Sequence, residues 1–192
     1  MHQAVRGMRD ILPTDTWRWS HLERKLFQRL IGASYSEIRL PLMEFTELFA
    51  RGVGEATDIV EKEMYTLADR DGMSISLRPE GTASCVRALE EHGLLYNKTC
   101  RTFYSGPMFR YEKPQKGRYR QFYQMGIEAF GFDGPDIEAE LVLLITKYFE
   151  EIGLNQYLTL EINTLGSHED RGRYREALVS YLTPFYRELD ED

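Results

Sequence analysis

The sequence predicts an α+β fold in which an antiparallel β-sheet is flanked by helices. Runs of aromatic and β-branched residues come in pairs joined by turns or loops, which is typical of antiparallel hairpins. Segments with apolar residues at helical spacing lie between these pairs. The chain has 192 residues, of which 42% are hydrophobic and 29% charged. It is therefore long enough for one domain with a substantial core.

The first expected element is a long amphipathic helix that begins after Pro13 and ends near Gly32. Thr14 or Asp15 is a plausible N-cap for it. The next run, "SEIRLPLMEF", predicts a short strand. Because proline cannot donate a hydrogen bond to a ladder, Pro41 restricts this strand to an edge, an end or an interface.

A β-hairpin and a helix are expected next. In "MYTLADRDGMSISLRPE", the triplet Arg70-Asp71-Gly72 is typical turn chemistry between two extended runs. From Thr82 the pattern becomes helical, and this helix should close near Gly93.

Two further strands, "CRTFYSGPMFRYE" and "RQFYQMGIEAFGF", are expected to form a hairpin with a basic loop. Five cations fall within eleven positions against the single acid Glu112, and they are Arg110, Lys113, Lys116, Arg118 and Arg120. The chain as a whole has a net charge of −7. Such local clustering in an acidic chain indicates an anionic ligand.

The remaining sequence predicts a helix, a strand and a second helix. "GPDIEAELVLLITKYFEEIG" has Asp133 and Pro135 at its start and apolar residues along one face. "YLTLEIN" is predicted to be a strand. Ser167 and Asp170 have the spacing of a capping box at the start of the last helix, which Pro184 should kink or break.

Composition excludes several classes of protein. No stretch resembles a signal peptide or approaches the ~18 apolar residues of a membrane span, so we expect a soluble, cytoplasmic protein without membrane contact. Cys85 and Cys100 have neither metal-site nor disulfide-scaffold spacing, and we expect buried, reduced thiols. The acidic total argues against a protein that coats nucleic acid over its whole surface. "GVGEATD" lacks the ending of a Walker loop, and the histidines suggest no nucleophilic site.

Alternation along the basic hairpin separates two faces. One face is expected to carry Arg110, Glu112, Phe122, Gln124, Gly126 and Glu128. The opposite face, expected to be the core side, carries Tyr123, Met125, Ile127 and Ala129. A glycine within a strand suggests that something approaches its backbone closely, and we expect a ligand over Gly126. The alternative is that the polar face is simply the solvated side of the sheet.

The polar face has the groups that a nucleotide and an amino acid require together. An arginine can hold a phosphate through two hydrogen bonds, and Glu112 can accept one from an amine. Phe122 can stack on a base. Gln124 and Glu128 can bind a cationic or amide-like group. We therefore expect two ligands side by side on this face.

The segment "GPMFRYEKPQKGRYRQFYQMGIEAFG" resembles motif 2 of class II aminoacyl-tRNA synthetases, and in detail that of the histidyl-tRNA synthetases. Six further segments are similar to the same family in order: "RGMRDILP", "YSEIRLPLME", "EKEMYT", "LRPEGTA", "GPDIEAEL" and "NTLGS". The resemblance implies a class II catalytic core, with residues 1–192 forming the N-terminal portion of that domain.

The family resemblance also implies an activity and its partners. The enzyme activates histidine with ATP and Mg²⁺ to histidyl-adenylate and transfers it to tRNA(His). Catalysis relies on positioning and charge stabilisation, without a protein nucleophile or a protein metal site. "FQRLIGASYSEIRLP" resembles motif 1, which places Pro41 at a homodimer interface.

Individual roles follow from the resemblance alone. Arg110 would be the catalytic arginine. The implied histidine-binding residues are Glu80, Gly81, Thr82, Arg110, Gln124 and Glu128. ATP would be bound by Arg110, Glu112, Arg118 and Phe122. The tRNA acceptor end would meet Gln115, Lys116 and Arg120.

The sequence departs from the family pattern after these motifs. It shows no glycine-rich motif 3, histidine-specific segment or anticodon-binding domain. We therefore expect an incomplete core with weak or no aminoacylation by itself. Two non-catalytic alternatives stay open: a dimerising interaction module, and a regulatory subunit of the type that partners ATP phosphoribosyltransferase.

Overall fold

The computed structural model describes residues 2–53, 63–164 and 166–189. The chain divides into two compact units, residues 1–155 and 156–192, and each is described by itself. Parts of "GVGEATD" and "EKEMYT", and Leu165 of "NTLGS", lie outside the described residues. Among the described residues, no helix has the length and apolar character needed to cross a bilayer.

Helix α1 (Pro13–Gly32) confirms the predicted long helix. Its N-cap is Leu12, so the predicted cap at Thr14 or Asp15 was wrong. Pro13 occupies the first helical position, where its missing N–H has no intrahelical acceptor to lose.

The run around Pro41 forms two short strands rather than one. Strand β1 (Ser36–Glu37) ends before the proline, and β2 (Met43–Phe45) begins after it. Pro41 belongs to neither strand, in keeping with its inability to donate to a ladder.

The second sheet has the strand order β2-β4-β3 and contains the predicted turn hairpin. Helix α2 (Thr46–Val53) follows β2, and the hairpin strands are β3 (Thr66–Ala68) and β4 (Ser74–Leu77). At the turn, the Asp69 carboxylate accepts hydrogen bonds from the N–H groups of Asp71 and Met73 at 2.9 and 2.8 Å. Helix α3 (Thr82–Glu91) follows, as predicted.

The first sheet has the order β1-β5-β6. Strands β5 (Cys100–Phe109) and β6 (Gln121–Phe130) pair along their full lengths, with Cys100 opposite Phe130 and Phe109 opposite Gln121. Strand β1 runs parallel to β5 at the other edge. The sequence predicted an antiparallel sheet, and the observed sheet is mixed. The long connection between β1 and β5 permits this direction. The α+β class is confirmed.

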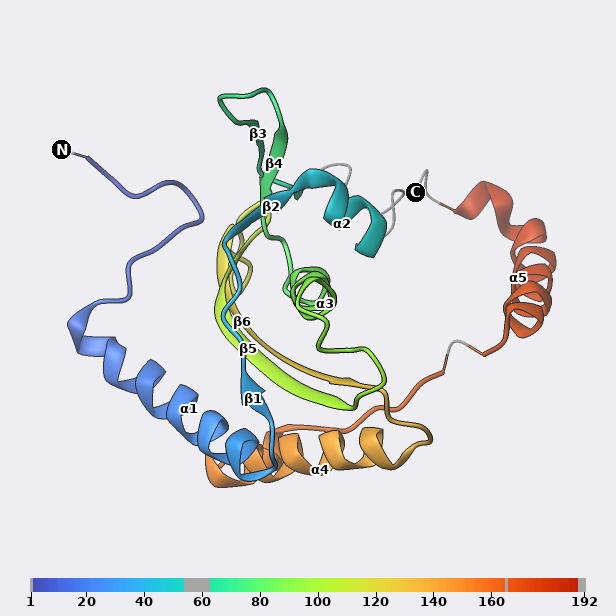
Figure 1. Cartoon of the computed structure of the whole chain (residues 1–192). Coiled ribbons are helices and arrows are strands. Elements are labelled where there is room, and N and C mark those ends of the chain that lie inside the picture. The colour runs from blue at the N-terminus through green and yellow to red at the C-terminus, as the bar shows by residue number, and fades with distance from the viewer. Residues whose placement is uncertain (1, 54–62, 165, 190–192) are drawn as a thin grey trace. The chain divides into compact units, whose positions relative to one another are not determined.

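Helices cover both faces of the β5–β6 hairpin (Figure 1). Helices α1 and α4 (Asp136–Glu151) cover one face. The core there contains Leu26, Leu30, Tyr35, Phe103 and Tyr148, with Met125 and Ile127 packed against it. Helix α3 covers the concave face, where the core contains Cys85, Leu89, Tyr104 and Met108. The predicted core side of β6 is thus confirmed at Met125 and Ile127, but the opposite face is packed as well.

Residues 156–192 contain one predicted element and lack another. Helix α5 (His168–Leu182) starts with the predicted capping box, since the Asp170 N–H donates to Ser167 Oγ at 3.1 Å and the Ser167 N–H to Asp170 Oδ2 at 3.0 Å. It gives way to a 3₁₀ segment (Thr183–Glu188) at Pro184, as predicted. The strand predicted at "YLTLEIN" was wrong, because a 3₁₀ turn (Asn155–Tyr157) leads into irregular backbone there.

Candidate functional site

The candidate site lies on the concave face of β5 and β6, beside the start of α3 (Figure 1). Cross-strand pairing aligns four residue pairs on this face: Thr102–Glu128, Tyr104–Gly126, Gly106–Gln124 and Met108–Phe122. Four of the predicted site residues therefore follow one another along a single strand face, as the alternation argument required.

Tyr104, which sequence reasoning missed, lies at the centre of this face. It is 2% exposed. A Cβ atom added at Gly81 or at Gly126 would lie less than 3.0 Å from its ring. The space that Gly126 leaves is therefore filled by Tyr104, and the prediction of a ligand there is corrected. The sequence carried no direct signal of this contact, because it depends on the register that pairs Tyr104 with Gly126.

A hydrogen-bond network joins Tyr104 to the start of α3. Thr82 Oγ1 donates to Glu128 Oε1 at 2.8 Å, and the Tyr104 hydroxyl donates to the same oxygen at 3.3 Å. Burial raises the pKa of Tyr104 above its ordinary value, so the phenol remains protonated and able to donate. Glu128 is thus held in one orientation, with its second oxygen available to a ligand.

Glu80 is also fixed in place, by the first turn of α3. Its carboxylate accepts hydrogen bonds from the N–H groups of Thr82 at 2.5 Å and Ala83 at 3.0 Å. These donors would otherwise lack intrahelical acceptors, and the helix dipole favours an anion at this end. Glu80 and Thr82 also line an open cavity of about 730 Å³ between α2 and α3.

Arg110 and Phe122 come together at the end of β5. Arg110 Nε donates to Pro79 O at 2.9 Å, and its guanidinium lies 5.2 Å from the centroid of the Phe122 ring. Phe122 itself packs against the α3-side core. Gln124 lies two residues after Phe122 on the same face of β6. Its Oε1 is buried without a hydrogen-bond partner in the described part of the chain. A buried amide oxygen without a partner is a position where a donor group of a ligand would be favoured.

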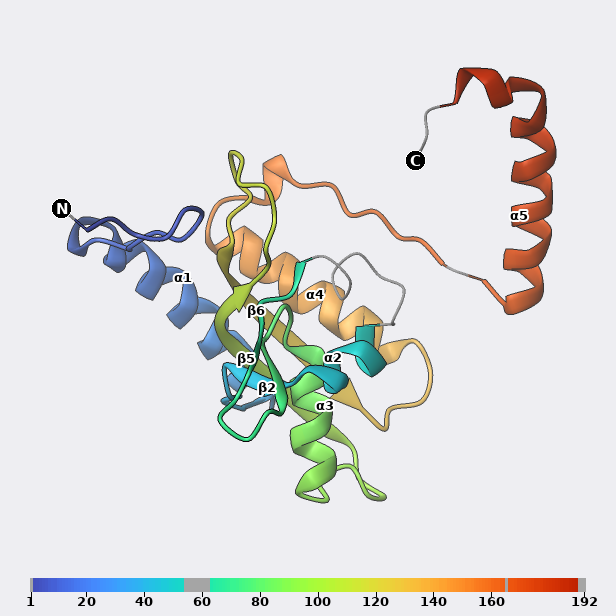
Figure 2. The ribbon, with the colours of Figure 1, turned by 90° about the horizontal axis from the view of Figure 1, so that it is seen from above.

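The basic loop extends beyond the ends of β5 and β6 (Figure 2). Strand β5 ends at Phe109, so strand alternation does not extend to Glu112, contrary to the prediction. The buried Glu112 forms an ion pair with Arg118, and its carbonyl oxygen accepts a hydrogen bond from Arg120 Nε at 3.1 Å. Gln115 and Lys116 are exposed at the loop tip.

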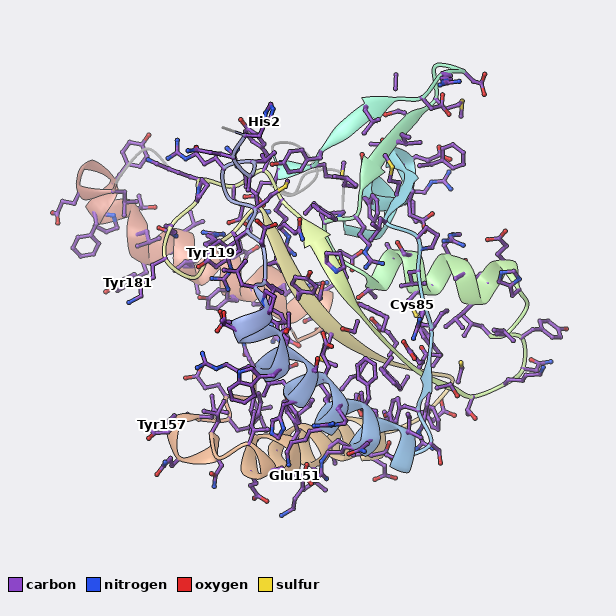
Figure 3. The ribbon with its side chains drawn as sticks, turned by 90° about the vertical axis from the view of Figure 1, so that its left-hand side faces the viewer. His2, Cys85, Tyr119, Glu151, Tyr157 and Tyr181 are labelled. Carbon is purple, nitrogen blue, oxygen red and sulfur yellow. The ribbon has the colours of Figure 1, made fainter. Side chains whose placement is uncertain are left out.

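The N-terminal segment supports the base of this loop, which the sequence did not indicate. Gly7 O accepts hydrogen bonds from the N–H groups of Arg120 at 2.8 Å and Gln121 at 3.2 Å. The Arg9 guanidinium lies 4.5 Å from the ring centroid of Tyr119, which is labelled in Figure 3.

The two cysteines differ in burial. Figure 3 labels Cys85 on α3, and the Cys85 Sγ lies 3.5 Å from Thr102 Oγ1. Cys85 is a buried free thiol and Cys100 a half-buried one, so full burial is confirmed only for Cys85.

The structure brings the predicted residues together in two groups. Glu80, Thr82 and Glu128 form one group with Tyr104, and Arg110 and Phe122 form the other. In the loop, Glu112 contacts both Arg118 and Arg120. Pro41 lies between β1 and β2. In the described ranges, no three His, Cys, Asp or Glu side chains are grouped as a metal site. The arrangement offers a cluster of carboxylate and hydroxyl groups and an arginine against Phe122, with further cations in the adjoining loop.

Comparisons with known proteins agree on one family. A family model described as histidyl-tRNA synthetase matches residues 7–166. The crystal structure of apo S. aureus histidyl-tRNA synthetase is 39% identical, with a TM-score of 0.76, over 100% of this chain and 45% of that one.

Two structures with 22% identity share the fold. One is an ATP phosphoribosyltransferase regulatory subunit/histidyl-tRNA synthetase from Bacillus halodurans C, with a TM-score of 0.68 over 80% of this chain and 38% of that one. The other is a histidine–tRNA ligase subunit from Alicyclobacillus acidocaldarius, with a TM-score of 0.67 over 80% and 43%. The present chain spans less than half the length of each of the three.

Proposed function

The chain belongs to the histidyl-tRNA synthetase family, and on this premise we propose that the concave face of β5 and β6 binds histidine and ATP and joins them into histidyl-adenylate. A histidine carboxylate oxygen attacks the α-phosphorus of ATP, the new O–P bond forms, and the bond to pyrophosphate breaks. The protein contributes positioning and charge stabilisation to this step.

The observation that carries the proposal is the setting of Arg110. Its Nε is hydrogen-bonded to Pro79 O, which leaves the two terminal nitrogens of the guanidinium for ligands. They can donate together to two oxygens of a phosphate or carboxylate. An arginine fixed in this way stabilises the charge that develops on the α-phosphate without reorganising during the reaction.

The histidine pocket would be formed by the polar groups deeper in the face. Glu128 can accept a hydrogen bond from the imidazole, because Thr82 and Tyr104 already orient its other oxygen. The unpaired Gln124 Oε1 and the Glu80 carboxylate are suitable acceptors for the α-amino group. Gly81 contributes no free space beside them, because the Tyr104 ring lies where its side chain would be.

ATP would enter at the loop end of the face, with Mg²⁺ bound to its phosphate oxygens as part of the substrate. Glu112 and Arg118 pair with each other in the ligand-free chain. Adenine binding by Glu112 and phosphate binding by Arg118 would therefore require this ion pair to open. Phe122 would offer its ring to the base on the side away from Arg110.

Transfer of histidine to tRNA(His) would use the rim of the site. Gln115 and Lys116 at the exposed loop tip, with the half-buried Arg120 at its base, would meet a phosphate backbone. A homodimer through the Pro41 region is supported by exposed apolar side chains nearby: Leu42, Met43 and Phe45 are 45%, 37% and 52% exposed.

Calorimetric titration of the chain with histidine and with Mg²⁺·ATP tests the proposal. Replacing Arg110 by alanine should weaken ATP binding by about tenfold or more, because a charge-assisted bidentate contact is lost. Arg39→Ala is a matched control, since that side chain is 85% exposed and pairs with Glu37 away from the site.

The same titration separates the non-catalytic alternatives. A dimerising module, or a regulatory subunit of the kind named for the Bacillus halodurans protein, does not need Arg110 to bind phosphate. If the unmodified chain bound ATP and the Arg110→Ala variant bound it equally well, the synthetase proposal would be wrong.

A further inference from the structure

Arg78 is a buried arginine to which the proposed reaction assigns no role. It directly follows β4 and is 3% exposed. Its guanidinium donates to three main-chain oxygens in the described part of the chain: Nε to Pro107 O at 3.0 Å, and Nη1 to Leu40 O and Pro41 O at 3.0 and 3.3 Å. No described carboxylate is hydrogen-bonded to it, and burial lowers its pKa. A cation held in this way by carbonyl groups alone requires an explanation.

The main chain of Arg78 joins the same two segments as its side chain. Its N–H donates to Leu42 O at 3.0 Å, and its carbonyl oxygen accepts from the Phe109 N–H at 3.0 Å. Residues 40–42 and 107–109 are therefore both attached to this one residue. The first segment contains Pro41, and the second ends immediately before Arg110.

A glycine in β5 makes room for the guanidinium. A Cβ atom at Gly106 would lie less than 3.0 Å from Arg78 Nη2. Gly106 lies within the strand and pairs with Gln124 of β6. A glycine at such a position weakens a strand, so its presence here is explained by the close approach of the arginine.

The residue after Arg78 provides the link to the site. Pro79 O accepts the hydrogen bond from Arg110 Nε at 2.9 Å. We propose that Arg78 is a positioning residue for Arg110, and that it couples the Leu40–Pro41 segment to the arginine end of the β5–β6 face. This inference rests on the function proposed above, because the ligand contact that it supports is the one assigned to Arg110.

Two substitutions displace the guanidinium in different ways. Arg78→Lys keeps the charge, but a single ammonium cannot reach acceptors on two separate segments with the fixed geometry of a guanidinium. Gly106→Ala keeps the arginine and places a methyl group where Nη2 lies. Gly32→Ala is the control, since a Cβ there meets nothing within 4 Å.

The first measurement is the ¹⁵N-detected Nε–H resonance of Arg110 in the full chain without ligand, assigned with Arg110→Lys. In both variants this resonance should shift, and its proton should exchange with water about tenfold faster, as expected when one hydrogen bond is lost. In Gly32→Ala it should remain as in the unmodified chain.

The second measurement compares Mg²⁺·ATP with adenosine by calorimetry. Because Arg110 acts on phosphate, both variants should weaken ATP binding by about tenfold and leave adenosine binding unchanged. A merely structural role would weaken both ligands alike, and this result would overturn the proposal.

The remaining outcomes are also decisive. An unchanged Arg110 resonance in folded variants would disprove the coupling. Failure of both variants to fold would assign Arg78 to the core and equally overturn the proposal. If the unmodified chain bound neither nucleotide, the proposed function would fail, while the resonance would still decide whether Arg78 positions Arg110.

Discussion

The two faces of the β5–β6 hairpin are packed in different ways, one mainly by apolar side chains and the other by close contacts with glycine and by hydrogen bonds. On the face covered by α1 and α4, Phe103, Met125 and Ile127 fill space among other apolar side chains. On the face covered by α3, Tyr104 requires a glycine on each side, and Glu128 accepts from two hydroxyl groups. The first face depends on apolar volume, and the second on particular shapes and donors.

Within one hairpin, the α1–α4 face therefore carries residues that stabilise the fold through apolar packing, and the α3 face carries the polar residues of the candidate site. Neighbouring positions such as Phe103 and Tyr104 point to opposite faces, so the hairpin can carry a polar site without opening the core. Substitutions on the α1–α4 face should therefore act through lost apolar volume, and those on the α3 face through steric clashes and lost hydrogen bonds.

The largest effect is expected for Phe103→Ala. Phe103 is fully buried, and its ring packs edge-to-face on Phe27 with 5.0 Å between centroids. Removing it should lower the free energy of unfolding by about 3–5 kcal/mol, measured by urea denaturation. Phe103→Leu, which keeps most of the volume, should cost clearly less. Equal losses for the two variants would mean that volume does not govern this face.

Gly126→Ala should have the next largest effect. The added methyl group meets the Tyr104 ring, and overpacking of this kind costs about 1–3 kcal/mol in unfolding free energy. The loss should appear without any ligand. If the glycine instead served a ligand, stability would be unchanged and only binding would fall.

A double-mutant cycle sharpens this comparison. Tyr104→Leu shortens the side chain that occupies the space over Gly126. The double variant Tyr104→Leu/Gly126→Ala should therefore lose less stability than the two single losses added together. Additive losses would show that the two residues do not share this space.

Sequence reasoning predicted the features that depend on local rules. Alternation along β6 gave the shared face of Phe122, Gln124 and Glu128, and the spacing of Ser167 and Asp170 gave the capping box. Both depend on residues close in sequence. The family resemblance supplied the residue roles, which neither alternation nor spacing could provide.

Features that depend on distant partners were missed. The "YLTLEIN" segment has strand alternation, but a strand also needs a hydrogen-bonding neighbour, and Leu158, Leu160 and Ile162 are 49%, 62% and 83% exposed. The support of the loop by Gly7 joins residues more than a hundred positions apart. The role of Gly126 could not be assigned until the pairing register placed Tyr104 opposite it.

The smallest effect is expected at Tyr35, at the polar edge of the α1–α4 face. Its hydroxyl donates to Glu140 Oε1 at 3.0 Å, and Arg101 Nη2 donates to Glu140 Oε2 at 2.9 Å. Tyr35→Phe should cost about 1 kcal/mol in unfolding free energy at neutral pH. As a control, Tyr96→Phe removes a hydroxyl from a side chain that is 79% exposed and should leave stability unchanged at that pH.

The pH dependence tests the cause of this loss. Burial, followed by the Glu140 hydrogen bond, raises the pKa of Tyr35 from 10.0 to about 12. Above pH 10 the unfolded chain releases this proton while the folded chain keeps it, so stability falls as pH rises toward 12. The contribution is fully present below pH 10, and phenylalanine has no such proton. The difference between the unmodified chain and Tyr35→Phe should therefore shrink between pH 10 and 12 in urea denaturation. If the stability difference between the two proteins stayed constant across that range, burial would not be raising the pKa of Tyr35. This edge of the apolar face would then be open to water.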